Sequence, residues 1–414
     1  MKFLNFGSCN IDYVYSMDHI VRVGETQSSD NLSIFPGGKG LNQSIALSRA
    51  GAHVYHAGCI GKDGDLLLDT LTDSGVDISY IRRVDEKNGH AIIQVSREGE
   101  NSIFLYAGSN SMITEEYVDS VLSNFESGDY ILLQNEINNL NYIIDKAYER
   151  DMFIILNPSP INEIIHGIDF SKLSCIILNE GEMIDITGAE DVEEGLEILN
   201  SKYPKLQIML TLGKNGCIYR YKNQKCSHPI FEAVAVDTTA AGDTFTGYFI
   251  AELSSGEDIK NIIKFASCAS AITVSRHGAA PSIPTRKEVL EALNVMKVHS
   301  KESKEATVLN RILKYIDDNM ADASLESLSE LLGYSVVYTG TLTKRLSGKS
   351  FKKILQEMRL ARAAVLLKTT DVSVGEIIRT VGYENESYFR EKFVEKYGCK
   401  PLEYRLSSRE QNKL

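Results

Sequence analysis

Hydrophobic residues in the first three quarters of the chain fall into short runs separated by longer amphipathic stretches. Four of these runs, at residues 130–133, 153–156, 175–178 and 208–212, are rich in Ile and Leu and have almost no polar position. Runs of this length that are apolar on both sides are typical of buried parallel strands, and the amphipathic stretches between them fit the crossover helices. The pattern therefore predicts an α/β domain built from parallel βαβ units.

The pattern changes after about residue 305. Apolar residues there recur at helical spacing, first at Leu309, Ile312, Leu313 and Ile316 and later at Ile354, Leu355, Met358 and Leu360, with no run typical of a strand. Between the two regions lies a segment of charge and serine with little to bury. We expect an α/β domain over residues 1–296, a linker over 297–305 and an all-helical domain over 306–414.

Composition and charge sharpen this division. The chain has 414 residues, 43% of them hydrophobic and 24% charged, which is typical of globular domains and excludes disorder as the main state. Its net charge is −12, but residues 305–414 carry 18 Lys and Arg against 15 Asp and Glu, so the acidic excess belongs to the first domain. A nucleic-acid coat over the whole surface is excluded, whereas a local basic patch in the tail is possible.

Cysteine usage and the N-terminus indicate the compartment. The seven cysteines include no Cys-x-x-Cys pair, so neither a disulfide framework nor a zinc finger is indicated. The first residues lack the apolar stretch of a signal peptide, and no run approaches the ~20 apolar residues that span a bilayer. We expect a cytoplasmic protein that does not bind membranes.

The first chemical motif is Pro-Gly-Gly-Lys-Gly-Leu-Asn-Gln at residues 36–43, which leads into a helical stretch. Paired glycines let the backbone approach a ligand closely, and Lys39 and Asn42 are donors suited to hydroxyl-rich compounds. Taken alone, the motif also fits a glycine turn with a solvated lysine. It does not have the P-loop spacing.

The second motif is Asp-Thr-Thr-Ala-Ala-Gly-Asp-Thr-Phe-Thr-Gly at residues 237–247, between a β-rich run at 233–236 and a predicted helix. Small residues at a helix N-terminus leave N–H groups free to bind a phosphoryl group. Asp243 lies in this turn, where a carboxylate can accept the proton of an attacking hydroxyl. The alternative is that Asp243 only caps the helix.

The two motifs, in this order and about 200 residues apart, resemble the two signatures of the PfkB sugar-kinase family, and specifically those of ribokinases. The resemblance covers about residues 2–291. It implies a three-layer α/β/α domain with a small β lid over the sugar, formed near residues 11–35 and 89–106. It also implies a homodimer that associates through this lid.

The resemblance further implies the roles of individual residues. Catalysis falls to Asp243 as the base, with Ala240, Ala241 and Gly242 in the anion-binding turn. The sugar-binding set is Asn10, Asp12, Gly38, Lys39, Asn42, Glu136 and Asp243, and the ATP-binding set is Asn179, Thr211, Gly213, Gly216 and Gly242. Individually, Asn10, Asp12 and Glu136 could also serve a turn or a helix cap.

Two cations are implied as well. Glu182, in Leu-Asn-Glu-Gly-Glu at 178–182, would act on Mg²⁺ through water, although Gly181 replaces the commoner Thr of the family. A potassium site would be enclosed, mostly through backbone carbonyls, by Asp237, Thr239, Thr273, Arg276, Gly278 and Ser282. The alternative for this last segment is a plain loop.

The tail contains two similar blocks, at residues 324–334 and 372–383, each a short amphipathic helix ended by glycine and followed by a second helix. The second block and its continuation resemble AraC/XylS-type DNA-binding domains, and this resemblance covers about residues 307–406. It implies that helices beginning near Val336 and Asn385 enter successive major grooves of double-stranded DNA. Candidate contacts are Tyr338, Thr341, Lys344, Arg345, Asn385, Ser387, Tyr388 and Arg390, whereas Phe389 and Phe393 fit the core. The alternative is a helical domain that docks on another protein.

The sequence thus leads to one main hypothesis. A kinase domain phosphorylates D-ribose at the 5-hydroxyl with ATP, Mg²⁺ and K⁺, and the fused domain binds specific DNA to regulate transcription. The alternative hypothesis is a transcription regulator whose kinase-like domain mainly senses a sugar or a nucleotide.

Overall fold

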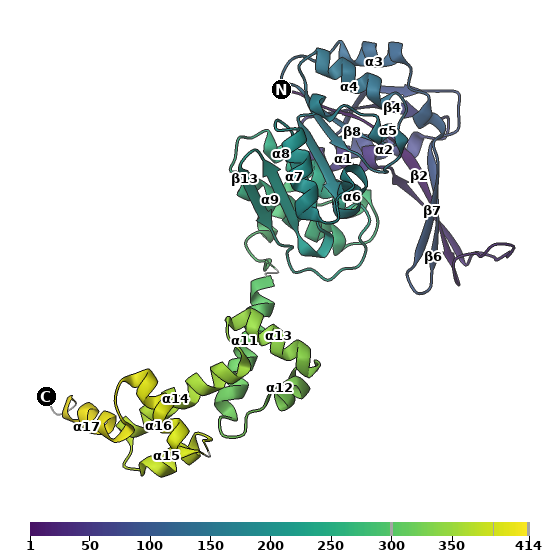
Figure 1. The fold of residues 1–414 in the computed structure, drawn as a ribbon. Helices are drawn as coiled ribbons and strands as arrows, with labels where there is room; N and C mark the ends of the chain where they lie inside the picture. The colour runs from purple at the N-terminus through teal and green to yellow at the C-terminus, as the bar shows by residue number, and fades with distance from the viewer. Residues whose placement is uncertain (299–300, 384, 412–414) are drawn as a thin grey trace. The chain divides into compact units, whose positions relative to one another are not determined.

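The computed structural model describes residues 1–298, 301–383 and 385–411, and it forms two compact units that divide between His299 and Ser300 (Figure 1). The division falls inside the segment expected to be a linker. Residues 299 and 300 of that segment lie outside the described residues, and residues 301–305 belong to helix α11 (Lys301–Asp318).

The first unit is organised around a nine-stranded sheet, in which the strands from β11 to β5 are parallel and the β12–β13 hairpin closes one edge antiparallel. The predicted strands at residues 130–133, 153–156, 175–178 and 208–212 are confirmed to within one residue at each end. In spatial order the strands are β13 (Gln224–His228), β12 (Cys217–Tyr221), β11 (Gln207–Thr211), β10 (Cys175–Asn179), β9 (Phe153–Asn157), β8 (Tyr130–Gln134), β1 (Phe3–Phe6), β4 (Val54–Ile60) and β5 (Asp77–Arg83).

Helices cover both faces of this sheet and give the predicted three layers. Successive residues of a strand point to opposite faces, so Phe3 of β1 joins one hydrophobic core while Leu4 and Phe6 join the other. The first core contains residues of α1 (Lys39–Arg49), α2 (Asp65–Asp73), α8 (Ala241–Leu253), α9 (Ile259–Val274) and α10 (Arg286–Ala292). The second contains residues of α3 (Glu115–Leu122), α4 (Leu140–Glu149), α5 (Glu163–His166), α6 (Glu180–Thr187) and α7 (Val192–Lys202).

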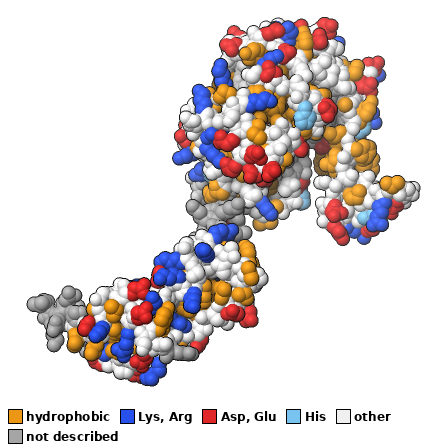
Figure 2. Space-filling view, viewed as in Figure 1, with side chains coloured by type: hydrophobic (Ala, Val, Ile, Leu, Met, Phe, Trp, Pro, Cys, Tyr) orange, Lys and Arg blue, Asp and Glu red, His pale blue; other side chains and the backbone are white. Residues whose placement is uncertain are grey.

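A separate four-stranded sheet projects from this body and forms the predicted lid (Figure 1). Its strand order is β3 (Asn31–Gly37), β2 (Asn10–Met17), β6 (His90–Ser96) and β7 (Asn101–Tyr106). These strands lie within or directly beside the expected segments 11–35 and 89–106. Figure 2 shows hydrophobic side chains gathered on the lid, and β7 is exposed along its whole length.

The expected strand at residues 233–236 is wrong. These residues form an extended loop without strand pairing, and the side chains of Val234 and Val236 are 80% and 44% exposed. The loop is held instead by the end of helix α9, because the backbone N–H of Val236 donates to the carbonyl of Val274 at 2.8 Å. The β-branched valines alone predicted a strand here, but the segment does not pair with the edge of a sheet.

Every secondary-structure element among the described residues of the second unit is a helix, as predicted. Two helix pairs have the expected helix-turn-helix form: α12 (Leu325–Leu332) with α13 (Val336–Ser347), and α15 (Val374–Thr380) with α16 (Glu386–Tyr397). Helix α14 (Phe351–Thr369) contributes its first half to the core of the first pair and its second half to that of the second, and α17 (Pro401–Gln411) ends the unit. Phe389 and Phe393 are fully buried, which confirms the prediction that they belong to the core.

Candidate active site

Helix α8 carries Asp243 in its first turn, but this residue does not cap the helix. The N-cap is Ala240, which has a positive φ of 58° and makes no side-chain capping bond. The carboxylate of Asp243 points away from the helix backbone and accepts hydrogen bonds from Asn42 Nδ2 at 3.1 Å and Gln43 Nε2 at 2.9 Å. The capping alternative for Asp243 is therefore wrong, and the two sequence motifs meet at this carboxylate.

The glycine motif positions the Asp12 carboxylate and the start of helix α1 on the other side of the site. A Cβ on Gly37 would lie 2.1 Å from Asp12 Oδ2, so only glycine lets the Asp12 carboxylate lie against this backbone. Helix α1 begins directly after, with Gly38 as its N-cap, and presents Lys39 and Asn42. Gly38, Lys39, Asn42 and Asp12 are thus brought into one neighbourhood from two strands of the lid and the start of α1.

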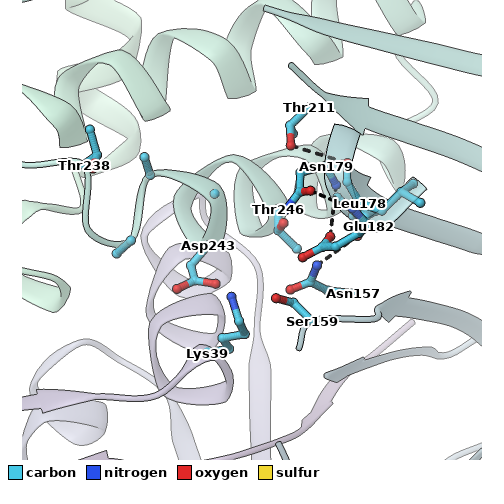
Figure 3. Close-up of a pocket in the computed structure, with 14 residues that line it drawn as sticks. Lys39, Asn157, Ser159, Leu178, Asn179, Glu182, Thr211, Thr238, Asp243 and Thr246 are labelled. Carbon is cyan, nitrogen blue, oxygen red and sulfur yellow. Dashed lines mark hydrogen bonds between the residues drawn. The ribbon is translucent and has the colours of Figure 1, made fainter. Parts of the chain in front are cut away.

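A cavity of about 240 Å³ lies in front of Asp243 (Figure 3). The side chains of Lys39 and Asp243 face each other at one side of it, and Asn179, Glu182 and Thr211 lie at the other. Its lining residues are Lys39, Asn157, Ser159, Ile177, Leu178, Asn179, Glu182, Thr211, Thr238, Ala240, Ala241, Gly242, Asp243 and Thr246.

Charge is concentrated beside the cavity. Burial disfavours the Lys39 ammonium, but the carboxylates of Asp243, Glu136 and Glu182 outweigh burial and raise the pKa of Lys39. Burial, together with the charges of Glu136 and Asp243, raises the pKa of Asp12 to about 7. Burial also raises the pKa of Glu136, against the hydrogen bond from Ser8 and the charge of Lys39. The Lys39 ammonium is thus the cation that balances the charge of several neighbouring carboxylates.

The other predicted sugar-binding residues, Asn10 and Glu136, are held in place by hydrogen bonds. Asn10 is buried, and its Oδ1 accepts from Asn110 Nδ2 at 2.7 Å. Glu136 Oε2 accepts from the Ser8 hydroxyl and, at 3.0 Å, from the backbone N–H of Lys39. Asn10 lies in strand β2 and neither forms a turn nor caps a helix. Glu136 does lie in a turn and caps α1, because Lys39 is the first residue of that helix, and this role leaves it beside the site.

A second cavity, of about 350 Å³ and mostly apolar, adjoins the first and shares Thr211, Thr238, Ala241 and Gly242 with it. Gly213 and Gly216 line it, and Phe231, Phe245 and Val274 supply apolar surface. Each residue of the predicted ATP-binding set lines one cavity or both. An apolar cleft beside a polar cavity at a helix N-terminus suits a ligand with a flat base and phosphate groups.

Asn179 and Glu182 have a structural task of their own. They form a capping box on α6, in which Glu182 Oε2 accepts from the Asn179 N–H at 3.0 Å and Asn179 Oδ1 accepts from the Glu182 N–H at 2.9 Å. The box fixes both side chains at the edge of the cavity. Their oxygen atoms are ligands of the kind that suits a hydrated Mg²⁺.

The predicted potassium loop is tied together by Asp237. Its Oδ1 accepts from the N–H and the hydroxyl of Thr239, and its Oδ2 accepts from the Gly278 N–H at 3.0 Å. Partial burial opposes ionisation, but these bonds outweigh it and lower the pKa of Asp237. Thr273 and Ser282 are buried, and the Thr273 hydroxyl lies 3.0 Å from that of Thr244, whereas Arg276 pairs with Glu288 at 2.6 Å. An anionic loop held closed across two segments fits a monovalent cation, although the Thr273 and Arg276 side chains are already engaged.

Sequence reasoning missed several polar residues of the site. Ser8 and Asn110 support Glu136 and Asn10, Asn157 and Ser159 line the cavity, and Gln43 contacts Asp243. Two of these had a visible signal, since Asn157 and Ser159 directly follow the predicted strand at 153–156 and the carboxyl ends of parallel strands carry the sites of such sheets.

In the second unit, α13 presents the four residues expected to contact DNA. Tyr338, Thr341, Lys344 and Arg345 are all exposed. The helix begins at Val336, as expected, and Ser335 caps it by accepting from the Tyr338 N–H. The spacing of Tyr338, Thr341 and Arg345 puts them on one side of the helix.

The candidates on α16 are also exposed, but most of them have partners within the protein. Asn385 caps the helix by accepting from the Tyr388 N–H at 3.0 Å, the Tyr388 hydroxyl accepts from Gln356 Nε2 at 3.1 Å, and Arg390 pairs with Glu386 at 3.3 Å. Ser387 is exposed as well. Contacts from this helix to DNA would therefore replace bonds that already exist.

Comparison with known proteins agrees with the division into two units. A model of the pfkB family of carbohydrate kinases matches residues 2–286, and a helix-turn-helix domain model matches residues 328–407. The ribokinase of Haemophilus influenzae is 35% identical over 297 residues, which are 69% of this chain and 96% of that protein.

Solved structures give the same result for the first unit. A ribokinase of Cryptococcus neoformans in complex with ADP matches with a TM-score of 0.63 and 33% identity, over 70% of this chain and 99% of that one. A ribokinase of Arabidopsis thaliana complexed with ribose and ATP matches with a TM-score of 0.63 and 27% identity, over 70% and 98%. Among the described residues, no helix combines the length and apolar character needed to cross a membrane. The chain therefore belongs to the PfkB family of carbohydrate kinases, and its kinase domain is fused to an AraC/XylS-type helix-turn-helix domain.

Proposed function

We propose that the kinase unit transfers the γ-phosphoryl group of ATP to the 5-hydroxyl of D-ribose. The observation that carries this proposal is the meeting of the two motifs at Asp243, where one carboxylate faces the cavity beside Lys39 and is bonded to Asn42. Support for ribose comes from the ribokinase relatives and from the Arabidopsis structure with ribose and ATP.

Asp243 is the proposed base. Its carboxylate accepts the proton of the 5-hydroxyl as the oxygen attacks phosphorus, and the bond from phosphorus to the ADP oxygen breaks. In the first turn of α8 the N–H of Ala241 donates to the Thr238 carbonyl at 3.3 Å, so it would have to exchange this bond to bind the phosphoryl group. The N–H groups of Gly242 and Asp243 have no acceptor four residues back, and we propose that they face the negative charge that develops on the phosphoryl group. The positive end of the α8 dipole acts in the same direction.

The remaining residues bind and orient. Asn10, Asp12, Gly38, Lys39, Asn42 and Glu136 hold the sugar hydroxyls, since amides and carboxylates each bridge adjacent hydroxyl groups. Asn179 and Glu182 would hold Mg²⁺ through water, and this ion neutralises phosphate charge when it is bound with the nucleotide. The loop that Asp237 ties to Gly278 would hold K⁺ and so fix the turn that precedes α8.

The enzymatic proposal is tested by coupled ADP release over a panel of pentoses and hexoses, with and without K⁺. We expect ribose to be preferred and Asp243→Asn to lower kcat at least ~100-fold with little change in nucleotide affinity. Turnover of Asp243→Asn at the rate of the unchanged chain would overturn the role of Asp243. Binding of ribose without any turnover would instead favour the sensor hypothesis.

We further propose that the second unit binds specific double-stranded DNA and regulates transcription. The exposed side of α13 with Tyr338, Thr341, Lys344 and Arg345 supports this, because a helix of this kind fits the major groove. Footprinting of the full chain on its own upstream DNA, with and without ribose and ATP, tests it. A salt-sensitive protected site is expected, and affinity that is equal on all sequences would contradict it.

We also propose that the chain forms a homodimer through the lid. A row of apolar side chains crosses the lid sheet from Ile34 through Tyr13 and Ile92 to Phe104. Ile34 and Phe104 are 50% and 55% exposed, which is costly for an isolated sheet in water. A second copy of the same sheet would cover this row.

A further inference from the structure

Gln43 is a fully buried polar residue of α1 that touches the proposed base. Its side-chain nitrogen donates to Asp243 Oδ1 at 2.9 Å and to Asn157 Oδ1 at 3.1 Å, and its Oε1 accepts from Gln134 Nε2 at 2.8 Å. Both amide hydrogens and the oxygen are therefore used. A buried amide with all its bonds made has one orientation, because rotating it would set donor against donor.

The direction of this amide is set by groups behind it. Gln134 Nε2 also donates to Asn5 Oδ1 at 3.0 Å, and Asn5 Nδ2 in turn donates to the backbone carbonyl of Gly40 at 2.7 Å. A carbonyl can only accept, so it fixes the Asn5 amide, which fixes that of Gln134 and then that of Gln43. Asn5, Gln134 and Gln43 are all fully buried and lie on three different elements, β1, β8 and α1.

From this chain of amides we infer that Gln43 is a positioning residue, which holds the Asp243 carboxylate in its working orientation by presenting a fixed donor to Oδ1. The inference rests on the proposed role of Asp243 as the base. Because Asn42 occupies Oδ2 from the same helix, the two amides clamp the carboxylate from both oxygens. When the Asn42 amide bonds to a sugar hydroxyl instead of Asp243, the Gln43 amide alone holds the Asp243 carboxylate in place.

The charges around Asp243 explain why a fixed donor is useful there. Lys39 is the neighbouring cation, whereas Asp12 and Glu136 add negative charge on the sugar side. Gln43 supplies a hydrogen bond to the Asp243 carboxylate without taking part in proton transfer. Loss of this donor would leave the carboxylate free to rotate among its charged neighbours.

The test replaces Gln43 with methionine, which has a similar length and no donor, and uses Ser44→Ala as the matched control. Ser44 is the next residue on α1 and is also fully buried, but it bonds Asn5 and His56 and does not contact Asp243. In Ser44→Ala the Asn5 amide keeps its bond to Gly40, so the direction of the chain is retained. Both variants are made in the full chain.

We expect Gln43→Met to lower kcat by roughly 10- to 100-fold while changing the KM for ATP less than threefold, because the orientation of the base is lost and the nucleotide site is not. We expect Ser44→Ala to lose thermal stability but to keep its kcat within about threefold. Gln43→Glu, which sets a carboxylate against Asp243, should lose at least as much activity as Gln43→Met.

Three outcomes would overturn the inference. They are an unchanged kcat in Gln43→Met, equal losses of kcat in Gln43→Met and Ser44→Ala, and a fall in kcat that is accompanied by an equal rise in the KM for ATP. The nucleotide affinity of each variant, measured by calorimetry, reports whether the kinase unit is folded. Asp243→Asn in the same assays separates this inference from the proposed function, because an active Asp243→Asn would refute the base itself.

Discussion

The carboxylates of Asp12, Glu136 and Asp243 lie close enough to repel one another, and this crowding has a thermodynamic cost. Asp12 lies in the lid strand β2 and presses its carboxylate against the backbone of Gly37. Burial and the neighbouring carboxylates raise its pKa from 3.8 to about 7 in the folded chain. The sugar-free site is therefore less stable when all its acids are ionised.

We predict that Asp12→Asn makes the stability of the kinase unit less dependent on pH between about pH 4 and pH 7. Between about pH 4 and pH 7 the folded chain keeps a proton on Asp12 that the unfolded chain has lost. The free energy of unfolding therefore falls as pH rises through this window, by up to about 1.4 kcal/mol per pH unit from this group. An asparagine does not titrate, so the variant should lose less stability from pH 5 to pH 8 than the unchanged chain.

Denaturant unfolding without sugar, followed at several pH values, measures this slope. Asp69→Asn is the matched control, because Asp69 is exposed on α2. Glu136 also contributes to the slope in both proteins, with its pKa raised in the same direction, so the comparison isolates Asp12. The same slope in Asp12→Asn and Asp69→Asn would contradict the prediction.

The sequence allowed the residues of known motifs to be predicted, but not the residues that hold them. Lys39, Asn42 and Asp243 stand in short motifs whose spacing is visible in the chain, and the structure brings them together. Gln43 and Asp243 are 200 positions apart, and Gln43 and Gln134 are 91 apart. A buried amide looks like any other polar residue in a sequence, since its partners come only from packing.

At the scale of elements, the site depends on how closely α1 and α8 approach. Gly247 of α8 faces α1, and a Cβ built on it would lie 2.4 Å from Ala46 Cβ and 2.7 Å from the Leu47 nitrogen. Helix α1 presents Lys39, Asn42 and Gln43, and α8 presents Asp243. Because Gly247, one turn beyond Asp243, has no side chain, α1 and α8 can approach closely. Gly247 therefore helps to set the distance between the amide donors on α1 and the Asp243 carboxylate.

We predict that Gly247→Ala destabilises the kinase unit by about 1–3 kcal/mol and lowers kcat. The added methyl group forces the helices apart, and this strain exceeds the gain in helix propensity of about 1 kcal/mol. Gly181→Ala on α6 is the control for stability alone, because the nearest atom to its Cβ, Asn179 Oδ1, would be 3.4 Å away and the residue adjoins the proposed Mg²⁺ site. Thermal unfolding and steady-state kinetics measure both effects, and a Gly247→Ala variant as stable as Gly181→Ala would refute the close contact.

In the second unit we predict that replacing a glycine with alanine stabilises the protein instead of destabilising it. Gly340 lies inside α13, where its added Cβ would meet only Leu325 Cδ2, at 3.4 Å. Because the end of a leucine side chain can move, Gly340→Ala should stabilise the tail by roughly 0.5–1 kcal/mol through helix propensity alone. Calorimetry of the full chain measures it, and a lower unfolding temperature of the tail would mean that the position is more tightly packed than these contacts indicate.

Element prediction succeeded where the burial pattern was strong. The strands from β8 to β11 are buried on both faces, so their apolar runs mark them in the sequence. Residues 233–236, which alternate Ala and Val, also resemble a strand in composition but lie exposed beside the end of α9, so that only tertiary structure decides their state. The paired strands of the lid were expected from the family resemblance and not from their own pattern.

At the scale of the whole molecule, one chain carries a strongly acidic kinase and a mildly basic DNA-binding domain. Residues 305–414 have a net charge of only +3, and the acidic Glu386 and Glu391 stand on α16 beside the candidate contacts. A single tail should therefore bind DNA weakly, because phosphate contacts supply most of the affinity. Two tails joined in one dimer would bind two adjacent sites with a much higher effective concentration.

We predict that Phe104→Glu dissociates the proposed dimer and thereby weakens DNA binding. Phe104 is 55% exposed on β7 and belongs to the apolar row on the lid, so a charge there would be buried without a partner in the dimer. Light scattering should change from twice the chain mass to the chain mass. Affinity for the footprinted site should fall by at least ~10-fold at constant salt, since avidity is lost while each tail keeps its contacts.

Glu98→Gln, an exposed change near the tip of the same lid, is the control and should leave both measurements unaltered. The effect of Phe104→Glu should also vanish on a DNA fragment cut to a single half-site, because one tail binds there in either state. If the affinity falls equally on the half-site, the substitution has damaged the chain rather than its association. If the unchanged chain already scatters as a monomer, the apolar row of the lid has another purpose than a second copy of this chain.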